Sequence, residues 1–241
     1  MRLGIVIPVF NEGGRLFSTV ERLGAFVAEG GLAALSIERV DVVLVDDGSQ
    51  PAVAIDAPPG GGLDLHLLRH YVNLGQGAAL QTGISYASSV LACDLLVTMD
   101  SDGQHRPEDL PALLGELRHE GADIVFGNRF ASGLPPGIPT SRLWILRAAA
   151  AFEVLLTGIR LRDAHNGFRA FTRAFALGLN LRQNRMAHAT EFKQHVARSG
   201  ARYREAPVSI TYSADSLGKG QRSSGSLIIL KDLLASYLFS R

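Results

Sequence analysis

The apolar run Leu95-Leu96-Val97-Thr98-Met99 stops at two carboxylates, a carboxamide and an imidazole, in the segment Asp100-Ser101-Asp102-Gly103-Gln104-His105. A short apolar run that ends in turn residues predicts a strand buried on both faces, here residues 94–99. Alternate side chains of an extended chain point the same way, so Asp100, Asp102 and Gln104 can present oxygen atoms to one side. Such oxygens suit Mg²⁺ or Mn²⁺, which keep coordination positions open for water or phosphate. The run therefore predicts a buried strand that ends at a metal site, although segment 100–103 alone is more typical of a solvated turn.

Strand and helix patterns alternate along most of the chain. Strands are predicted over residues 3–9, 40–45, 63–68, 94–99 and 124–126, and helices over 15–29, 75–90, 107–120 and 142–156. This alternation predicts an α/β fold with a parallel sheet and helices on both faces. In such sheets ligands bind beyond the carboxyl ends of the strands. The polar residues that follow these strands should therefore gather along one rim; they are Asn11, Glu12, Asp46, Asp47, Asn73, Asp100, Asp102, Asn128 and Arg129.

Length and composition narrow the class of protein. A chain of 241 residues with 46% hydrophobic content can bury one substantial core, and its formal charge of +1 excludes a globally basic nucleic-acid binder. Cys93 is the single cysteine, so no intramolecular disulfide can form, and the chain suits a reducing cytosol. We expect no signal peptide, because the chain passes from Met1-Arg2 directly into a strand pattern that ends at Pro8 and Asn11-Glu12. We expect no membrane-spanning segment, because no uninterrupted apolar stretch reaches about 18 residues. A soluble or membrane-peripheral protein is the expectation.

Several motifs, taken together and in order, resemble those of family 2 glycosyltransferases. They are Ile7-Pro8-Val9-Phe10-Asn11-Glu12, Val45-Asp46-Asp47-Gly48-Ser49, Asn73-Leu74-Gly75-Gln76-Gly77-Ala78-Ala79, Asp100-Ser101-Asp102-Gly103-Gln104-His105, Gly127-Asn128-Arg129-Phe130 and Asn166-Gly167-Phe168-Arg169-Ala170-Phe171. The resemblance is nearest to the dolichyl-phosphate mannose synthase, or polyprenyl-phosphate glycosyltransferase, branch. It implies a GT-A fold with a mostly parallel sheet over residues 1–212. A basic loop that is mobile until an anion orders it and an amphipathic helix are expected over residues 213–241.

The resemblance assigns a nucleotide-sugar donor and a divalent metal to the predicted rim. It implies that Asp46 or Asp47 contacts the base, in a pocket lined by Pro8, Asn11 and Glu12. The alternative for Asp46 is that it caps a turn. The metal, Mg²⁺ or Mn²⁺, would be held against the diphosphate by Asp100 and Asp102, with Gln104 as a third ligand. It would stabilise the charge that develops on the leaving nucleoside diphosphate.

Arginines are the candidate ligands of an acceptor phosphate. Arg129 follows a strand end, where its guanidinium can bind phosphate as a planar fork, and a surface ion pair is the alternative. The resemblance implies that Arg129 acts with a second arginine in the following helix. Arg142 is the best match for that residue, and Arg147 is the other candidate. Arg169, in the Gly-Phe-Arg motif, is also assigned to the acceptor phosphate.

The need for a catalytic base depends on the acceptor. Glu191 lies near the position of the acid in many family members, and Asp163 precedes the Gly-Phe-Arg motif. A phosphate monoester has a second pKa of about 6, so it arrives deprotonated and needs cations more than a base. Members with hydroxyl acceptors often carry a Glu-Asp pair where this chain has Glu191-Phe192, and this difference favours a phosphate acceptor. Asp102, Glu191 and Arg129 are the predicted catalytic residues.

The C-terminal segment completes the prediction. Lys219, with Arg222 as a second candidate, is expected to close over the diphosphate or the acceptor phosphate. The helix over residues 226–239 is expected at a membrane surface, a small membrane protein or a second subunit, and packing on the core is the alternative. We predict an inverting glycosyltransferase at the cytoplasmic face of the membrane that uses polyprenyl phosphate. The alternatives are transfer to a hydroxyl of a lipid-linked or surface glycan of the cell envelope, and a catalytically silent nucleotide-sugar-binding protein. A GDP or UDP donor and the identity of the sugar stay open.

Overall fold

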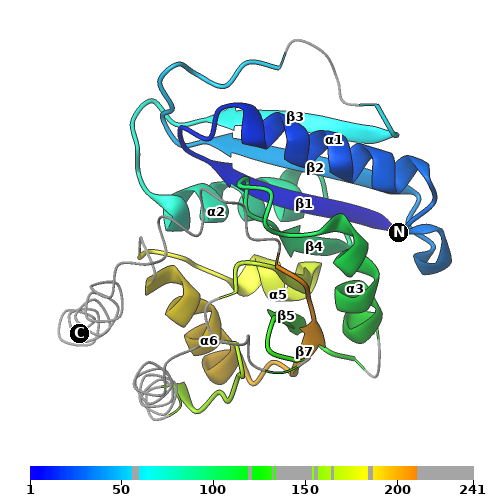
Figure 1. The fold of residues 1–241 in the computed structure, drawn as a ribbon. Coiled ribbons are helices and arrows are strands. Elements are labelled where there is room, and N and C mark those ends of the chain that lie inside the picture. Colours follow the sequence, from blue (N-terminus) through cyan, green and yellow to red (C-terminus); the bar gives the residue numbers. More distant parts are fainter. Residues whose placement is uncertain are drawn as a thin grey trace.

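The computed structural model describes residues 1–55, 60–118, 121–131, 133, 154, 157–163, 166–183 and 187–210. It contains a seven-stranded sheet (Figure 1). Its strands are β1 (Arg2–Val9), β2 (Arg39–Asp46), β3 (Leu63–Arg69), β4 (Leu95–Thr98), β5 (Ile124–Asn128), β6 (Arg169–Thr172) and β7 (Tyr203–Pro207). The strand order is β3-β2-β1-β4-β6-β5-β7.

All pairings in the sheet are parallel except those of β6, which runs antiparallel to β4 and β5. Arg169 of β6 therefore lies beside Thr98 at the end of β4 and beside Phe126 in β5. The structure confirms the predicted α/β class and the mostly parallel sheet. The strands β6 and β7 were not among the strands that the sequence predicted.

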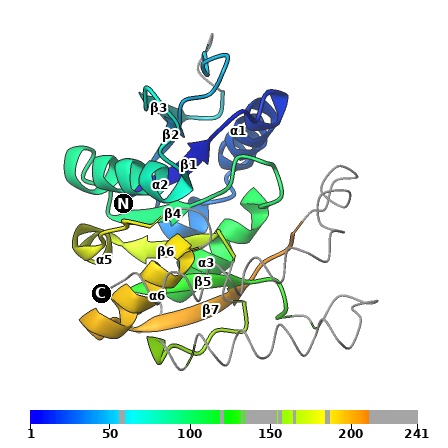
Figure 2. The same cartoon turned by 90° about the vertical axis from the view of Figure 1, so that its left-hand side faces the viewer.

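Helices cover both faces of the sheet. They are α1 (Gly14–Ala28), α2 (Gln76–Ser85), α3 (Leu110–Arg118), α5 (Arg173–Gly178) and α6 (Ala187–Ser199), with 3₁₀ turns at Ala33–Leu35 and Pro107–Asp109 and a π turn at Tyr86–Val90. The view in Figure 2 shows α1 and α3 on one face and α2, α5 and α6 on the other.

The central strand β4 contributes to both hydrophobic cores. Leu95, Val97 and Met99 belong to the core beneath α1 and α3, while Leu96 belongs to the core beneath α2, α5 and α6. All four are at most 8% exposed. Because both faces are covered, alternate residues are equally apolar, which explains the uninterrupted hydrophobic run.

The polar residues that follow the strands lie along one edge of the sheet, the one formed by the carboxyl ends of the parallel strands. The carboxyl ends of the parallel strands lie on the left in Figure 1, and Figure 2 looks onto this edge. Because β6 is antiparallel, its amino end brings residues 166–168 to the same edge. The predicted gathering of the residues after β1, β2, β4 and β5 follows from the parallel pairing.

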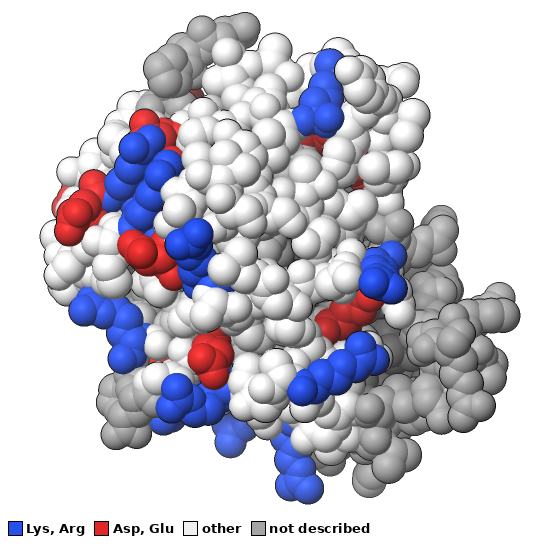
Figure 3. Space-filling model, turned by 180° about the vertical axis from the view of Figure 1, so that it is seen from behind, with Lys and Arg blue, Asp and Glu red and all other residues white. Residues whose placement is uncertain are grey.

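Some predicted features lie outside the described residues. These are most of the predicted loop 131–140, nearly all of the predicted helix 142–156, and the whole segment 213–241, with Arg142, Arg147, Lys219 and Arg222. In the part of the chain that is described, no helix has both the length and the apolar character needed to cross a membrane. On the face shown in Figure 3, basic and acidic side chains are interspersed, in keeping with the small formal net charge.

Candidate active site

The loop after β4 carries the predicted metal ligands, and hydrogen bonds fix its shape. The backbone N–H of Asp100 donates to His105 Nδ1 at 3.0 Å, and the backbone N–H of Gln104 donates to Asp102 Oδ1 at 3.0 Å. The His105 ring is 3% exposed and stacks on Phe168 with 4.8 Å between ring centroids. Since Nδ1 accepts a hydrogen bond, a neutral His105 carries its proton on Nε2, which lies 3.7 Å from Asp100 Oδ2. His105 therefore positions Asp100.

Asp100 is held at the centre of this edge by two further elements. Gln76, the first residue of α2, donates from Nε2 to Asp100 Oδ1 at 3.2 Å. On the other side, a Cβ atom at Gly167 would lie only 2.6 Å from Asp100 Oδ2. The backbone there is anchored by Thr98, whose Oγ1 donates to the carbonyl oxygen of Gly167 at 2.7 Å. The glycine of the Gly-Phe-Arg motif thus makes room for the Asp100 carboxylate.

The oxygen ligands that this loop offers suit a hard divalent cation that also binds phosphate oxygens of a substrate. Asp100, Asp102 and Gln104 are all partly exposed. Among the described residues, no three His, Cys, Asp or Glu side chains are grouped closely enough to enclose a metal ion. Mg²⁺ is usually bound by one or two carboxylates together with substrate phosphates, and this loop offers two carboxylates. Asp100, Asp102 and Gln104 are therefore the residues that would hold the metal.

A groove of about 450 Å³ lies between residues 100–105, which we call the metal loop, and the first turns of α1. It is lined by Asp102 and Gly103 on one side and by Arg15, Ser18 and Arg22 among the residues of α1 on the other. The arginines are already paired with acidic side chains, Arg15 with Glu12 at 2.7 Å and Arg22 with Glu108 at 3.8 Å. Asp102 therefore borders an open space large enough to admit a ligand.

The two predicted base-contacting carboxylates are both engaged within the protein. Asp46 is fully buried, and its carboxylate accepts hydrogen bonds from the backbone N–H groups of Ser49 (2.8 Å) and Val53 (3.1 Å). Burial raises the pKa of Asp46, whereas hydrogen bonds from Ser49 and Val53 and the charge of Arg69 lower it. The lowering effects are together larger, so the pKa of Asp46 lies below its usual value. This is the turn-capping arrangement that the sequence left open for Asp46.

Asp47 closes the loop that follows β3. Its carboxylate accepts hydrogen bonds from the backbone N–H groups of Leu74 (2.9 Å) and Gly75 (2.7 Å), and it contacts His70 Nδ1 at 2.7 Å. Asp47 is 2% exposed. A contact of either aspartate with a nucleotide base stays a prediction.

The remaining donor-site candidates lie at the end of β1. Pro8 is buried in the strand, opposite Val45. Asn11 has a positive φ of 54°, its backbone N–H donates to Ser49 Oγ at 3.0 Å, and its Oδ1 accepts from the backbone N–H of Gln50 at 2.9 Å. Asn11 therefore joins the loops after β1 and β2. Glu12, as noted, pairs with Arg15 on α1.

Arg129 forms an ion pair, which was its alternative role, although the partner carboxylate is buried and not at the surface. Its Nε and Nη2 donate to the two carboxylate oxygens of Asp163 at 2.7 and 2.9 Å, and its backbone N–H donates to Asp163 at 3.1 Å. Asp163 is 3% exposed and also accepts from Asn166 Nδ2 at 3.3 Å, so it is not placed to act as a general base. The Arg129 side chain remains 28% exposed at the end of β5, so it can still meet a ligand.

Arg169 is a buried cation without a hydrogen-bonding partner for two of its nitrogens among the described residues. It is 1% exposed, and Nε and Nη1 are the two nitrogens concerned. Its guanidinium carbon lies 4.7 Å from the centre of the Phe192 ring on α6. Burial lowers the pKa of Arg169 to about 10, while the negative charges of Asp100 and Asp163 act in the opposite direction. Arg169 therefore stays protonated at neutral pH, between the metal loop and the Arg129–Asp163 pair.

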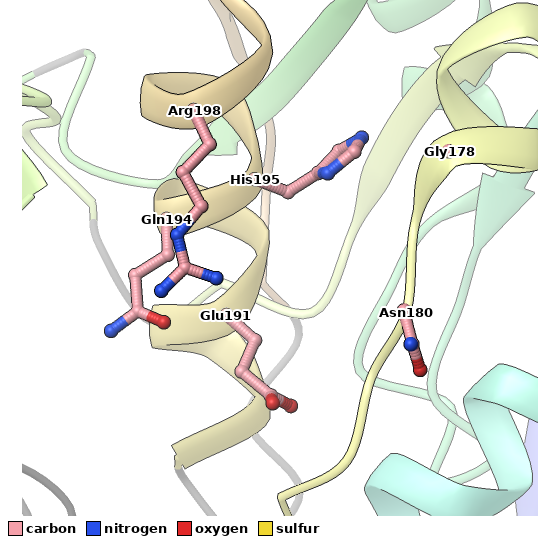
Figure 4. A pocket seen from close by; sticks show the side chains of 6 residues that line it. All are labelled: Gly178, Asn180, Glu191, Gln194, His195 and Arg198. Carbon is pink, nitrogen blue, oxygen red and sulfur yellow. The ribbon is translucent and has the colours of Figure 1, made fainter. Parts of the chain in front are cut away.

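Glu191 holds the chain segment between α5 and α6. Its carboxylate accepts hydrogen bonds from the backbone N–H groups of Arg182 at 2.9 Å and Gln183 at 2.9 Å. It borders a cavity of about 180 Å³ with Gln194, His195 and Arg198 of α6 and with Gly178 and Asn180 (Figure 4). In this view His195 points toward Gly178, away from the Gln194 and Arg198 side chains. A role of Glu191 as a base stays a prediction. To act as a base, its carboxylate would have to give up these hydrogen bonds and accept a proton from the substrate instead.

Three residues that shape the site had no role in the sequence prediction. His105 and Gly167 belong to two of the motifs named in the sequence analysis, and Gln76 lies between Gly75 and Gly77 of a third. Their positions in motifs were visible in the sequence, but their contacts with Asp100 join segments that are up to 67 residues apart and required the structure.

Comparisons with known proteins relate this chain to a family. Residues 4–177 match the family described as glycosyl transferase family 2. The chain is similar to an undecaprenyl-phosphate mannosyltransferase of Micrococcus luteus, with 31% identity over 93% of this chain and 89% of the relative. It is also similar to a polyprenol monophosphomannose synthase of Mycolicibacterium smegmatis, with 29% identity over 70% of this chain and 61% of the relative.

The fold has a solved counterpart. Glucosyl-3-phosphoglycerate synthase from Mycobacterium tuberculosis, crystallised with Mn²⁺, UDP and phosphoglyceric acid, matches with a TM-score of 0.56 and 17% identity, over 90% of this chain and 73% of that one. The match confirms the predicted GT-A fold. The sequence matches confirm the resemblance to the polyprenyl-phosphate branch.

Proposed function

Because the chain belongs to glycosyl transferase family 2, we propose that it moves a hexosyl group from a nucleotide sugar to polyprenyl phosphate, with inversion and with a divalent metal. The observation that carries the proposal is the buried guanidinium of Arg169. A buried guanidinium with two nitrogens that lack hydrogen-bonding partners among the described residues is costly, and an anionic ligand at the same edge would supply the missing interaction. Similarity to two polyprenyl-phosphate glycosyltransferases supports a lipid phosphate as that anion.

Asp100, Asp102 and Gln104 are proposed to hold Mg²⁺ or Mn²⁺ against the donor diphosphate. When bound, the metal would neutralise the charge that develops on the leaving nucleoside diphosphate. The loop is prepared for this role, since His105 and Gln76 both hold Asp100 in place. We further propose that Pro8, Asn11, Glu12, Asp46 and Asp47 surround the nucleotide.

The acceptor is proposed to be bound by arginines. Arg129 and Arg169, with Arg142, would hold the acceptor phosphate next to the anomeric carbon. A phosphate oxygen attacks that carbon on the side opposite the diphosphate, the bond from carbon to the diphosphate oxygen breaks, and the nucleoside diphosphate leaves with the electron pair. Since the phosphate is already deprotonated at neutral pH, no general base is needed. The internal hydrogen bonds of Glu191 and Asp163 support this choice over a hydroxyl acceptor, which would require a free carboxylate.

Lys219 is proposed to close over the phosphates. The last described residue, Ile210, pairs with His105 of the metal loop. The chain therefore continues toward Lys219 from a position beside the proposed metal ligands. In this proposal residues 1–212 are the catalytic domain, residues 213–241 supply the basic loop that carries Lys219 and an amphipathic helix, and the enzyme works at the cytoplasmic face of the membrane.

Nucleoside diphosphate release, measured with two acceptors of equal chain length, tests the acceptor assignment. With polyprenyl phosphate, release should be fast and should require Mg²⁺ or Mn²⁺, whereas polyprenol, which lacks the phosphate, should give no release above the background. Asp102→Asn should remove most of the metal-dependent release. Asp64→Asn is the matched control, because Asp64 is half exposed at the other end of β3. Equal release with both acceptors would refute the phosphate assignment, and unchanged release by Asp102→Asn would refute the metal assignment.

A further inference from the structure

Exposed apolar side chains are concentrated beside the site. Among the described residues, the exposed large hydrophobic side chains are Phe10, Phe17, Leu67, Tyr71, Val72, Leu74, Val90 and Leu177. Three of them belong to residues 71–74, which we call the apolar loop. Tyr71 is 102% exposed, Val72 62% and Leu74 48%. The loop lies between β3 and α2, at the left-hand edge of the sheet in Figure 1.

The exposure of the apolar loop is built into the fold. The buried carboxylate of Asp47 holds both ends of the loop, through His70 on one side and the backbone N–H groups of Leu74 and Gly75 on the other. His70 is fixed in turn by Thr82 Oγ1, 3.0 Å from its Nε2. The hydrogen bonds of this buried carboxylate therefore fix the loop in a shape that leaves three apolar side chains exposed to the solvent.

The neighbouring loop also fits closely against this segment. A Cβ atom at Gly48 would lie 2.7 Å from the backbone of Val72 and Asn73, so the loop after β2 packs directly on the apolar loop. Asn11 connects the loop after β2 to the loop after β1, where Phe10 is 46% exposed. The three loops form one connected rim with apolar side chains on its outer side.

The apolar loop is directly connected to the metal loop. The helix α2 begins at Gln76, immediately after the apolar loop and Gly75, and the Gln76 amide donates to Asp100 Oδ1. A surface that engages the apolar loop would therefore lie beside Asp100.

We propose that the apolar loop inserts into the surface of a lipid bilayer and brings the site to its acceptor; this inference rests on the proposed function. Tyr71, Val72 and Leu74 have the side chains of an interfacial anchor, with an aromatic ring that combines apolar and polar atoms. Arg69, half exposed at the end of β3, is already paired with the buried Asp46 at 3.6 Å, so the loop relies on its apolar side chains and not on charge. Three side chains on a protruding loop are far fewer than the roughly 20 to 30 residues per side of a stable protein interface, whereas a fluid bilayer can accept them.

Vesicle sedimentation of the full chain tests docking without any acceptor present. The vesicles contain phosphatidylcholine with a minor fraction of phosphatidylglycerol and no polyprenyl phosphate. The variant Tyr71→Ser/Val72→Ser/Leu74→Ser should bind about tenfold more weakly than the parent chain. Val90→Ser/Leu177→Ser is the matched control, since both residues are exposed apolar side chains outside the apolar loop, in the π turn before β4 and in α5, and it should bind as the parent does. Equal binding by the parent and the triple variant would overturn the proposal.

A fluorescence measurement locates the loop directly. The chain has a single tryptophan, so Tyr71→Trp in a Trp144→Phe background reports on the apolar loop alone. Its emission should shift to shorter wavelength with vesicles and be quenched by brominated lipid, while Val90→Trp in the same background should not respond. An unresponsive Tyr71→Trp would contradict insertion.

Transfer assays separate this proposal from the proposed function. The triple variant should lose transfer to long-chain polyprenyl phosphate in vesicles and keep transfer to a short-chain, water-soluble polyprenyl phosphate. If the parent chain glycosylated neither acceptor, the proposed function would fail, while the vesicle result would still decide docking. A rise in the donor KM of the triple variant with the soluble acceptor would place the loop in the donor site and overturn the proposal.

Discussion

Replacing Gly167 by alanine should disturb metal binding while leaving the fold intact. The new Cβ would lie 2.6 Å from Asp100 Oδ2 and 2.9 Å from Oδ1, whereas ordinary contacts begin at 3.4 Å. The nearer oxygen must therefore move by about 0.8 Å, which is several times the roughly 0.2 Å tolerance of a metal–ligand distance. Because the displaced atoms are at the end of a flexible side chain, the backbone need not move.

The expected effect is a loss of metal affinity by about 10- to 100-fold, which is typical of changes around a ligand. The free energy of unfolding should change by less than about 1 kcal/mol, since Gly167 is not among the residues with positive φ. The assay is the Mn²⁺ concentration that gives half-maximal turnover, with calorimetric titration of Mn²⁺ in the presence of UDP or GDP as the binding measurement.

The matched control for this experiment is Gly115→Ala in α3, where a Cβ atom meets nothing within 4 Å. It should stabilise the helix by up to about 1 kcal/mol and leave the Mn²⁺ requirement unchanged. If Gly167→Ala kept the parent Mn²⁺ requirement, the placement of Asp100 as a metal ligand against Gly167 would be refuted.

Three further changes test other parts of the structure. Burial raises the pKa of the fully buried Asp41, whereas hydrogen bonds from Arg2 and His66 lower it. The lowering effects are together larger, so the pKa of Asp41 is below its usual value of 3.8. The ionised carboxylate therefore stabilises the fold above pH 3.8, and this contribution is lost as the pH falls through the lowered pKa of the folded state. Asp41→Asn should cost about 3 kcal/mol in urea unfolding at pH 7, and the cost should decrease as the pH falls below 3.8. Asp163→Asn should release the Arg129 guanidinium and raise the KM for polyprenyl phosphate about tenfold with the donor KM unchanged, whereas Asp123→Asn, which changes the 3.8 Å pair with Arg202, should alter neither KM. Gly83→Ala would place a Cβ 2.4 Å from Val6 Cγ1, so it should lower the free energy of unfolding by about 1–3 kcal/mol without changing the turnover of the folded enzyme.

The sequence predicted the strands whose apolar runs are continuous. The strands β1, β2 and β4 are buried on both faces, so their patterns are unambiguous, and the predicted ends differ from the observed ones by at most one residue. Strand β6 was missed because it has only four residues and begins with a buried arginine. Strand β7 was missed because its sequence, Tyr203-Arg204-Glu205-Ala206-Pro207, mixes charged and apolar residues at the edge of the sheet.

The candidate site was predictable where its residues lie within one segment. The loop 100–105 carries its ligand pattern in consecutive residues, and the sequence was sufficient to propose a metal there. The partners of Asp47, Arg129 and Glu191 could not be read in this way. Asp47 binds backbone groups 27 and 28 residues away, and Arg129 pairs with a carboxylate 34 residues away. Such hydrogen bonds depend on how separate loops meet in space.

Mass spectrometry of the lipid product is the most direct test of the central claim. The purified full chain would be incubated with polyprenyl phosphate, Mg²⁺ or Mn²⁺, and a panel of UDP- and GDP-sugars, and the lipid extract would be analysed. The account predicts a polyprenyl phosphate whose mass increases by one hexosyl residue, formed with the parent chain and not with Asp102→Asn. A parent chain that bound a nucleotide sugar with metal but produced no glycosylated polyprenyl phosphate from any donor would contradict it.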